Sequence, residues 1–126
     1  MRYLSKEEIL VIHSRIIEET GGAHGVHDIG SVASLIERPK MQFGGKELYA
    51  TIFAKAAAYF ESCAMHHPFI DGNKRTAIAI AARFLYCNGY TLETSNKILE
   101  EFVLKCVVEK RTIQDIAAWF KKHSKK

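Results

Sequence analysis

Long apolar runs and paired cysteines are both missing from this sequence. No stretch approaches the roughly 20 apolar residues that a membrane-spanning helix needs, so no membrane association is predicted. The N-terminal residues turn charged and helical at once and lack the apolar region and cleavage site of a signal peptide. The three cysteines, Cys63, Cys87 and Cys106, form no CxxC pair and are odd in number. They are predicted to be small, buried, reduced residues of a cytoplasmic protein.

A strong excess of charge of one sign is also missing. The chain has 126 residues and a formal net charge of +4, part of which comes from the basic tail at residues 121–126. This balance does not demand nucleic-acid binding, which is therefore not expected. A hydrophobic content of 48% with 25% charged residues is typical of a globular protein. We expect a single domain over residues 1–126, with a solvated and frayed tail at 121–126.

Helical periodicity and helix-capping residues dominate the chain. Ser5 and Glu8 form the pattern of a capping box, and Gly21 and Gly22 stop the helix that follows. Segment 48–65 is apolar around most of its circumference, which is typical of a buried central helix. Further helices are predicted at residues 31–37, before Pro39; after the polar segment 66–75, up to the Asn88-Gly89 cap; at about 97–109; and from a second capping box at Thr112 and Asp115. The expected fold class is all-α, a compact bundle of about six helices with a short flap at residues 40–47.

The polar segment 66–77, HHPFIDGNKRTA, separates two apolar helical segments. The beginning of a helix presents unpaired N–H groups and a partial positive charge, so the residues from Gly72 to Arg75 are placed to bind an anion. Gly72 lets the backbone approach a ligand closely. Lys74 and Arg75 add cationic donors that suit phosphate oxygens. The segment therefore predicts a phosphate-binding site.

His67 and Asp71 add acid–base chemistry to the same loop. Histidine is the side chain type suited to proton transfer near neutral pH, so His67 can take a proton from a bound hydroxyl group. Asp71 could orient that imidazole or hold Mg²⁺ beside the phosphates. Phe69 is expected to turn inward and anchor the loop. A base, a cation site and a phosphate cradle in one loop predict phosphoryl or nucleotidyl transfer.

The segment resembles the signature of the Fic/Doc family, which runs His-Pro-Phe-x-acid-Gly-Asn-x-Arg. Residues 37–90 as a whole resemble its death-on-curing (Doc) branch, and the signature is filled by His67, Pro68, Phe69, Asp71, Gly72, Asn73 and Arg75. The resemblance implies a toxin that transfers the terminal phosphate of ATP to a hydroxyl of a target protein such as elongation factor Tu and blocks translation. It implies catalytic roles for His67, Asp71 and Arg75, a Mg²⁺ site at Asp71, and nucleotide binding by Gly72, Asn73, Lys74 and Arg75.

Some positions depart from the pattern of the family. Lys74 stands where AMP-transferring members have a glycine, and Ile78 replaces their second arginine. AMP transfer to a protein hydroxyl remains the alternative. His27 precedes Asp28 where the family often has an arginine. The internal inhibitory helix of some members has no match here, so the resemblance implies a separate antitoxin partner, expected to be encoded by a neighbouring gene.

The sequence is also compatible with two other functions and leaves the role of the flap open. The sequence HDIG at residues 27–30 is similar to the metal signature of HD phosphohydrolases, in which His and Asp ligands hold metals for phosphoester hydrolysis. A nucleic-acid module would instead use Lys74, Arg75 and Arg83 on a phosphate backbone, although their helix is too apolar to lie in a groove. The segment 40–49 is either a connecting loop or an edge to which a target segment pairs.

Overall fold

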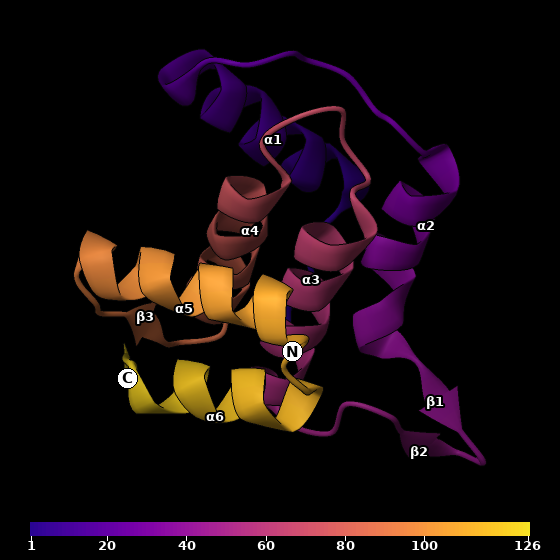
Figure 1. Ribbon diagram of the computed structural model, residues 1–126. Helices are drawn as coiled ribbons and strands as arrows, with labels where there is room; N and C mark the ends of the chain where they lie inside the picture. The colour runs from indigo at the N-terminus through magenta and orange to yellow at the C-terminus, as the bar shows by residue number, and fades with distance from the viewer.

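The helices of this protein pack around one central helix, α3, Ile52–His66 (Figure 1). The computed structural model describes residues 1–126, and α3 contacts α2, α4 and α6. The predicted all-α class, with six helices and a flap, is confirmed. No helix combines the length and the apolar character that crossing a membrane requires. The other elements are α1 (Lys6–Thr20), α2 (Ile29–Glu37), the 3₁₀ turn η1 (Arg38–Lys40), β1 (Gln42–Phe43), β2 (Lys46–Glu47), α4 (Asn73–Cys87), β3 (Thr91–Leu92), α5 (Asn96–Glu109), α6 (Ile113–Lys122) and β4 (Ser124–Lys125).

Aromatic rings fill the space between α3 and its neighbours. Tyr59 and Phe60 of α3 are fully buried. The Tyr59 ring lies 5.1 Å from that of Phe84 in α4, and the Phe60 ring lies 5.9 Å from that of Phe120 in α6. Burial raises the pKa of Tyr59 to about 12. These contacts on two different faces of α3 explain why its sequence is apolar around most of its circumference.

Capping side chains set where the helices begin. The predicted capping box of Ser5 and Glu8 forms both of its hydrogen bonds. The Thr51 hydroxyl accepts the N–H of the third residue of α3, so this helix starts later than predicted and residues 48–51 belong to the approach from the flap. The Thr112 hydroxyl accepts the Asp115 N–H at 3.1 Å without the reciprocal bond. The second predicted capping box is therefore half formed.

The cysteines occupy two kinds of surroundings. Cys63 and Cys106 are buried, as predicted, and burial raises the pKa of both thiols, that of Cys106 to about 12. Cys87 is only half-buried, and its sulfur accepts a hydrogen bond from the Arg2 guanidinium at 2.7 Å. The prediction of burial was wrong for Cys87, because this side chain packs at the margin of the core, where it also contacts Arg2.

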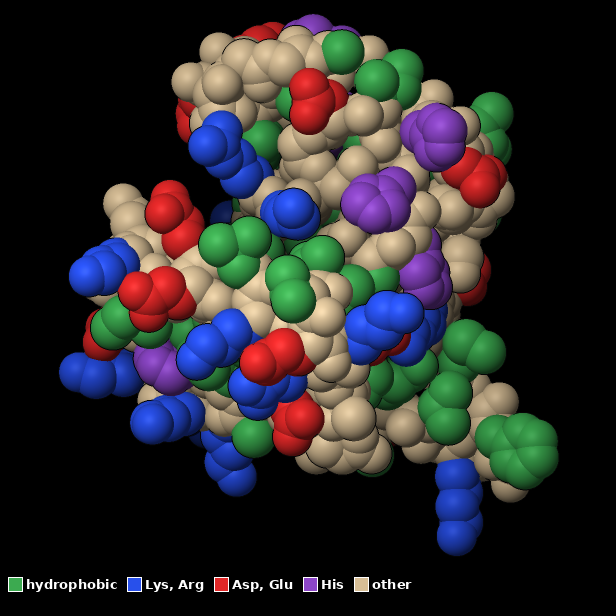
Figure 2. Space-filling model, in the orientation of Figure 1, with side chains coloured by type: hydrophobic (Ala, Val, Ile, Leu, Met, Phe, Trp, Pro, Cys, Tyr) green, Lys and Arg blue, Asp and Glu red, His purple; other side chains and the backbone are tan.

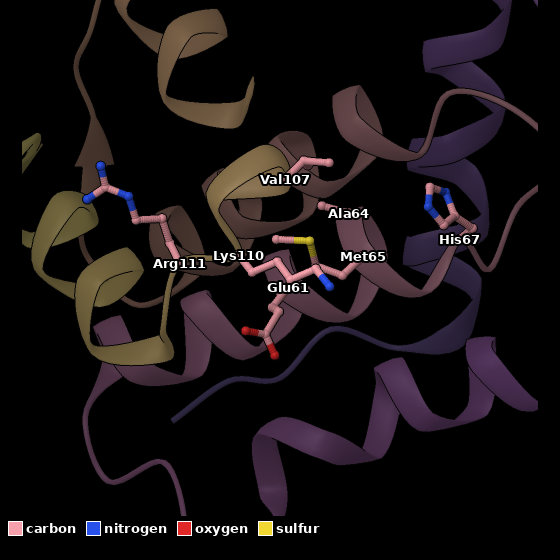
Figure 3. Close-up of a pocket in the computed structure, with 7 residues that line it drawn as sticks. All are labelled: Glu61, Ala64, Met65, His67, Val107, Lys110 and Arg111. Carbon is pink, nitrogen blue, oxygen red and sulfur yellow. The ribbon is translucent and has the colours of Figure 1, made fainter. Parts of the chain in front are cut away.

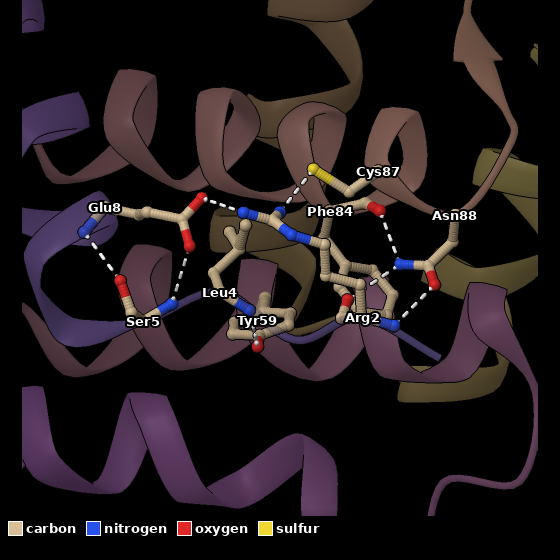
Figure 4. A network of polar contacts seen from close by, with 8 residues as sticks. All are labelled: Arg2, Leu4, Ser5, Glu8, Tyr59, Phe84, Cys87 and Asn88. Carbon is tan, nitrogen blue, oxygen red and sulfur yellow. Dashed lines mark hydrogen bonds and ion pairs between the residues drawn. The ribbon is translucent and has the colours of Figure 1, made fainter.

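The N-terminal segment is fastened to the end of α4 by a polar network (Figure 4). The Arg2 N–H donates to the Asn88 amide oxygen at 2.9 Å, and the Asn88 amide nitrogen donates back to the Arg2 carbonyl at 2.9 Å. The Arg2 guanidinium also pairs with Glu8 at 2.9 Å, while the Leu4 N–H donates to the Tyr59 hydroxyl. The first residues are thus held against the bundle before α1 begins.

The C-terminal residues are ordered, which corrects the predicted frayed tail. Helix α6 extends through Lys122, and β4 then pairs antiparallel with β3. The Glu93 N–H donates to the His123 carbonyl at 2.7 Å, and Lys125 forms an exposed ion pair with Glu93 at 3.2 Å. A basic tail pattern cannot reveal this pairing, because its partner strand lies more than thirty residues earlier in the chain.

The predicted flap is a short hairpin between η1 and α3. Its two strands, β1 and β2, pair antiparallel, with Gln42 opposite Glu47. Gly44 and Gly45 form the tip, and both have positive φ angles that favour glycine. Figure 1 shows the hairpin at the end of α3 that lies opposite the polar loop joining α3 to α4. In the same orientation, Figure 2 shows hydrophobic and basic side chains projecting outward over the hairpin.

Candidate active site

The polar motif forms the loop that joins α3 to α4. His67 closes α3 with a left-handed backbone, φ 48°, and Gly72 precedes α4 with φ 74°. A Cβ at Gly72 would lie 2.9 Å from Cδ1 of Ile17. The backbone conformation and this close neighbour both favour glycine, so the loop needs Gly72 for its own fold as well as for any ligand.

Phe69 anchors the loop to α1, and its predicted inward orientation is confirmed. The side chain is 1% exposed. Its ring stacks on the imidazole of His13, with 3.8 Å between centroids and 6° between planes. The same imidazole donates from Nε2 to the Asp71 carbonyl at 2.8 Å. One buried histidine of α1 therefore holds the loop at two points.

Asn73 has a structural task that the sequence reasoning missed. Its buried amide donates to the Phe69 carbonyl at 2.9 Å and accepts the Phe69 N–H at 3.0 Å. Both polar atoms of the side chain are thus engaged within the loop. Only the backbone N–H of Asn73 is left for the predicted phosphate contact. It lies in the first turn of α4 and has no partner within the helix.

Backbone hydrogen bonds to residues 25–28 hold the loop from another side. The Pro68 carbonyl accepts the N–H groups of His27 and Asp28 at 2.9 and 3.2 Å, and the Ile70 N–H donates to the Gly25 carbonyl. The loop backbone is therefore held on both sides before any ligand binds. Such preorganisation favours catalysis, because little reordering is needed when a substrate arrives.

The side chains with the predicted chemistry remain accessible. His67, Asp71, Lys74 and Arg75 are all exposed, and the side chains of His67, Lys74 and Arg75 form no hydrogen bond or ion pair within the chain. The Asp71 carboxylate accepts the Gly72 N–H at 2.9 Å and the Ala23 N–H at 3.3 Å. The loop thus presents an imidazole and two free cations to solvent beside a helix N-terminus, which is a suitable arrangement for a phosphate ester.

His67 and the two cations line different cavities. The cavity at His67 has a volume of about 310 Å³ and lies between the second half of α3 and the junction of α5 with α6. Figure 3 shows His67 at one end of it and Arg111 at the other. The cavity at Lys74 and Arg75, about 460 Å³, lies between α1, α4 and α5. The cavity at His67 is lined by Glu61, Ala64, Met65, His67, Val107, Lys110 and Arg111.

Two residues of the site were missed by the sequence reasoning. His13 follows Ile9 and precedes Ile17 at helical spacing, so it lies on the buried face of α1, and this stripe was the signal that could have revealed it. Lys110 lines the cavity of His67 from the end of α5. No local pattern announces Lys110, since only the packing of α5 against α3 brings it there.

The HDIG segment has a structural role. The Asp28 carboxylate caps α2 by accepting the N–H groups of Gly30 and Ser31, which starts this helix before the predicted residue 31. A hydrogen bond from the Ser31 hydroxyl, with those from the backbone, holds the pKa of Asp28 below its ordinary value. No three metal-ligating side chains come together anywhere in the chain. The residues offered for an HD-type metal site are therefore not assembled as one.

Helix α4 does not offer the surface that a nucleic-acid-binding module would need. Most faces of α4 are buried, including Thr76, Ile80 and Phe84, so this helix cannot lie in a groove. Arg83 sits over the Tyr86 ring, 5.6 Å from its centroid, at a distance along α4 from Lys74 and Arg75. These three cations do not form one continuous binding face.

Comparisons with known proteins assign the chain to a family. The model of the Fic/DOC family matches residues 3–85, which include the whole motif loop. Toxin Doc of Mycolicibacterium smegmatis is 39% identical over 90 residues, covering 71% of this chain and 67% of that protein. Protein kinase doc of Escherichia phage P1 is 33% identical over 100 residues, covering 79% of each chain. The chain therefore belongs to the Fic/DOC family.

Proposed function

We propose that this protein is a Doc-like toxin that transfers the terminal phosphate of ATP to a hydroxyl of a target protein. One observation carries the proposal: an exposed histidine and two unpaired cations flank the free N–H groups at the start of α4, on a loop fixed by its own hydrogen bonds. The names of the two relatives, a toxin and a protein kinase, support it. Elongation factor Tu is the candidate target, and arrested translation in the cytoplasm is the expected consequence.

In this proposal each loop residue has a defined task. His67 takes the proton of the acceptor hydroxyl, whose oxygen bonds to the γ-phosphorus while the bond from that phosphorus to ADP breaks. Lys74, Arg75 and the backbone N–H groups of the first turn of α4 bind phosphate oxygens and stabilise the charge that develops on them. Arg75 can hold two oxygens at once, which fixes the direction of the phosphate group.

Asp71 fits the part of a Mg²⁺ ligand together with the nucleotide. It is the one carboxylate of the loop, is exposed, and lies immediately before the start of α4. A single carboxylate with phosphate oxygens and water is a usual donor set for Mg²⁺, which would neutralise phosphate charge there. A second role for Asp71 needs no metal, since its carbonyl accepts a hydrogen bond from His13 and its carboxylate accepts one from the Ala23 N–H.

Phosphate transfer is favoured over AMP transfer by two side chains. Lys74 adds a charged side chain where AMP-transferring relatives leave the backbone open, and Ile78, one turn later, lines the same cavity as Lys74 and Arg75. An apolar residue there cannot grip an outer phosphate as a second arginine would. A nucleotide bound in the opposite direction to that in AMP-transferring relatives would place its terminal phosphate between His67 and the cations. ADP would then be the leaving group.

Labelled ATP distinguishes the two reactions. We expect label from the γ-phosphate to reach elongation factor Tu and label from the α-phosphate not to reach it. The reason is that the Lys74 side chain narrows the space that a glycine leaves open for the inner phosphates of ATP in AMP-transferring relatives. Mass spectrometry of the acceptor should show one added phosphate, and the His67→Ala chain serves as the blank. Lys74→Gly should weaken the preference for γ-transfer. An α-label on the acceptor with the wild-type chain would replace the kinase proposal by AMP transfer within the same family.

An antitoxin partner is the second part of the proposal. The cavity beside Lys74 and Arg75 has an apolar lining that includes Ile16, Ile78 and Leu104 from three helices. A groove of this kind suits the apolar face of a partner helix that folds on binding. A helix bound there would also cover the two phosphate-binding cations, so it would block the nucleotide.

Growth experiments test the toxin proposal in the cell. Expression of the wild-type chain alone is expected to arrest growth, because nothing covers the site. Co-expression of the neighbouring gene product should restore growth, and the His67→Ala chain should be harmless at the same expression level. Harmless expression of the wild-type chain, in a cell that contains the target, would remove the main support for a toxin.

A further inference from the structure

Residues 23–28 run antiparallel to the loop that joins α3 to α4. A bridge pairs Val26 with Phe69, and the backbone hydrogen bonds described above join the two segments on either side of this bridge. Antiparallel segments advance in opposite directions, so Ala23 is brought to the level of the residues that follow Phe69. The next contact between the two segments therefore falls at the end of the loop, beside Asp71.

The side chain of Asp71 makes this next contact. Its Oδ2 accepts the Ala23 N–H at 3.3 Å, and its Oδ1 accepts the Gly72 N–H at 2.9 Å. Each carboxylate oxygen thus binds one backbone donor and keeps lone pairs for a further partner. A carboxylate held at both oxygens has lost most of its freedom to rotate. Binding a cation therefore requires little further ordering of this side chain.

Gly22 lets the chain pass close enough for this contact. A Cβ at Gly22 would lie 2.7 Å from Oδ2 of Asp71 and 3.1 Å from its Cγ, so any side chain there would push the carboxylate away from Ala23. Gly21 also has a positive φ, 82° against 115° at Gly22, but a Cβ at Gly21 would meet nothing within 4 Å. The need for glycine at position 22 therefore comes from Asp71 as well as from the backbone.

The direction of the Asp71 carboxylate matters because Mg²⁺ demands a strict arrangement of its oxygen ligands. Groups that orient a ligating carboxylate contribute strongly to metal binding, and losing one typically lowers metal affinity or activity by about 10- to 100-fold. In this chain the orienting groups are two backbone N–H groups, from Ala23 and Gly72. Asp71 is the one carboxylate of the loop, so no neighbouring residue of the loop can replace it.

We propose that Gly22 is a positioning residue that, together with the Ala23 N–H, sets the direction of the Asp71 carboxylate toward Mg²⁺ and the nucleotide phosphates. The proposal rests on the transfer reaction proposed above, and it adds a segment outside the motif that controls the metal site. Gly22 has no side chain and acts only through Asp71. Changes at residue 22 therefore alter the requirement for Mg²⁺ and leave the affinity for the acceptor protein unchanged.

A matched pair of alanine variants separates this role from backbone strain. Gly22→Ala and Gly21→Ala both place alanine at a positive φ, so both should lower the midpoint of urea unfolding, but only Gly22→Ala should displace Asp71. The Mg²⁺ concentration for half-maximal γ-phosphate transfer should rise by about 10- to 100-fold in Gly22→Ala and stay unchanged in Gly21→Ala. KM for the acceptor should not change in either. Calorimetry of Mg²⁺ binding to the chain saturated with a non-hydrolysable ATP analogue should show the same loss without any transfer.

A double-mutant cycle on stability tests the contact itself and needs no activity. Asp71→Ala removes the carboxylate that a Cβ at residue 22 would meet, so Gly22→Ala should lower the urea midpoint less in the Asp71→Ala background than in the wild type. Gly21→Ala should cost the same in both backgrounds. If Gly22→Ala alone does not fold, folding of the double variant supports the same contact.

The outcomes separate the contact, the metal role and the reaction. Equal losses for Gly22→Ala in the two backgrounds, or failure of both Gly22→Ala chains to fold, would overturn the contact with Asp71. An unchanged Mg²⁺ requirement in Gly22→Ala would overturn the positioning role. If the wild-type chain transfers no phosphate and binds no Mg²⁺ with the ATP analogue, the proposed reaction and the metal role fail together. The stability cycle then still decides whether Gly22 sets the place of Asp71.

Discussion

Replacing His67 by alanine is expected to abolish phosphate transfer while leaving the fold intact. The imidazole is the general base of the proposed transfer, and its loss should lower kcat by about 10²- to 10⁴-fold. The side chain is exposed and makes no hydrogen bond within the chain, so little packing is lost. Transfer of γ-label and the melting temperature, measured on the same preparation, check the two halves of this prediction.

The backbone at residue 67 calls for a second variant. His67 has φ 48°, and alanine in the left-handed region costs about 1–2 kcal/mol, whereas asparagine tolerates it better. His67→Asn should therefore be as inactive as His67→Ala and at least as stable. His66→Ala, at the neighbouring exposed position, is the control and should keep its activity. Full activity in either His67 variant would end the catalytic assignment.

Replacing Phe69 by alanine is expected to give the largest loss of stability in the loop. The ring is 1% exposed and stacks on His13, so its removal should lower the free energy of unfolding by about 3–5 kcal/mol. Denaturant unfolding followed by circular dichroism measures this loss. Activity should fall as well, because the same histidine holds the Asp71 carbonyl and the loop would lose its inner support.

Two neighbouring variants separate packing from a general sensitivity of the loop. Ile70→Ala removes a side chain that is 56% exposed and should change the free energy of unfolding by less than about 0.5 kcal/mol. Phe69→Leu keeps an apolar group and should cost clearly less than Phe69→Ala. A change below about 1 kcal/mol in Phe69→Ala would show that the ring contributes little packing, contrary to its burial.

Local signals explain what was predictable in this protein. The Ser5–Glu8 box, the glycines of the flap and the apolar periodicity of α3 each depend on residues a few positions apart, and the structure confirms them. The motif from His67 to Arg75 was equally visible, because its residues are consecutive and their order has no use in a packed core. Their chemical roles remain predictions, since these follow from the chemistry of the residues and their place beside the start of α4.

Only the tertiary structure could decide the rest, because it depends on contacts between distant parts of the chain. The stack of His13 on Phe69 and the bond of His13 to Asp71 join residues more than fifty positions apart. The residues expected to form a frayed tail are instead ordered by the pairing of β4 with β3. The separation of His67 from Lys74 and Arg75 into two cavities depends on how α5 lies across α3 and α4. Sequence periodicity specifies which face of each helix is buried, but the partner of that face is chosen by packing of the whole chain.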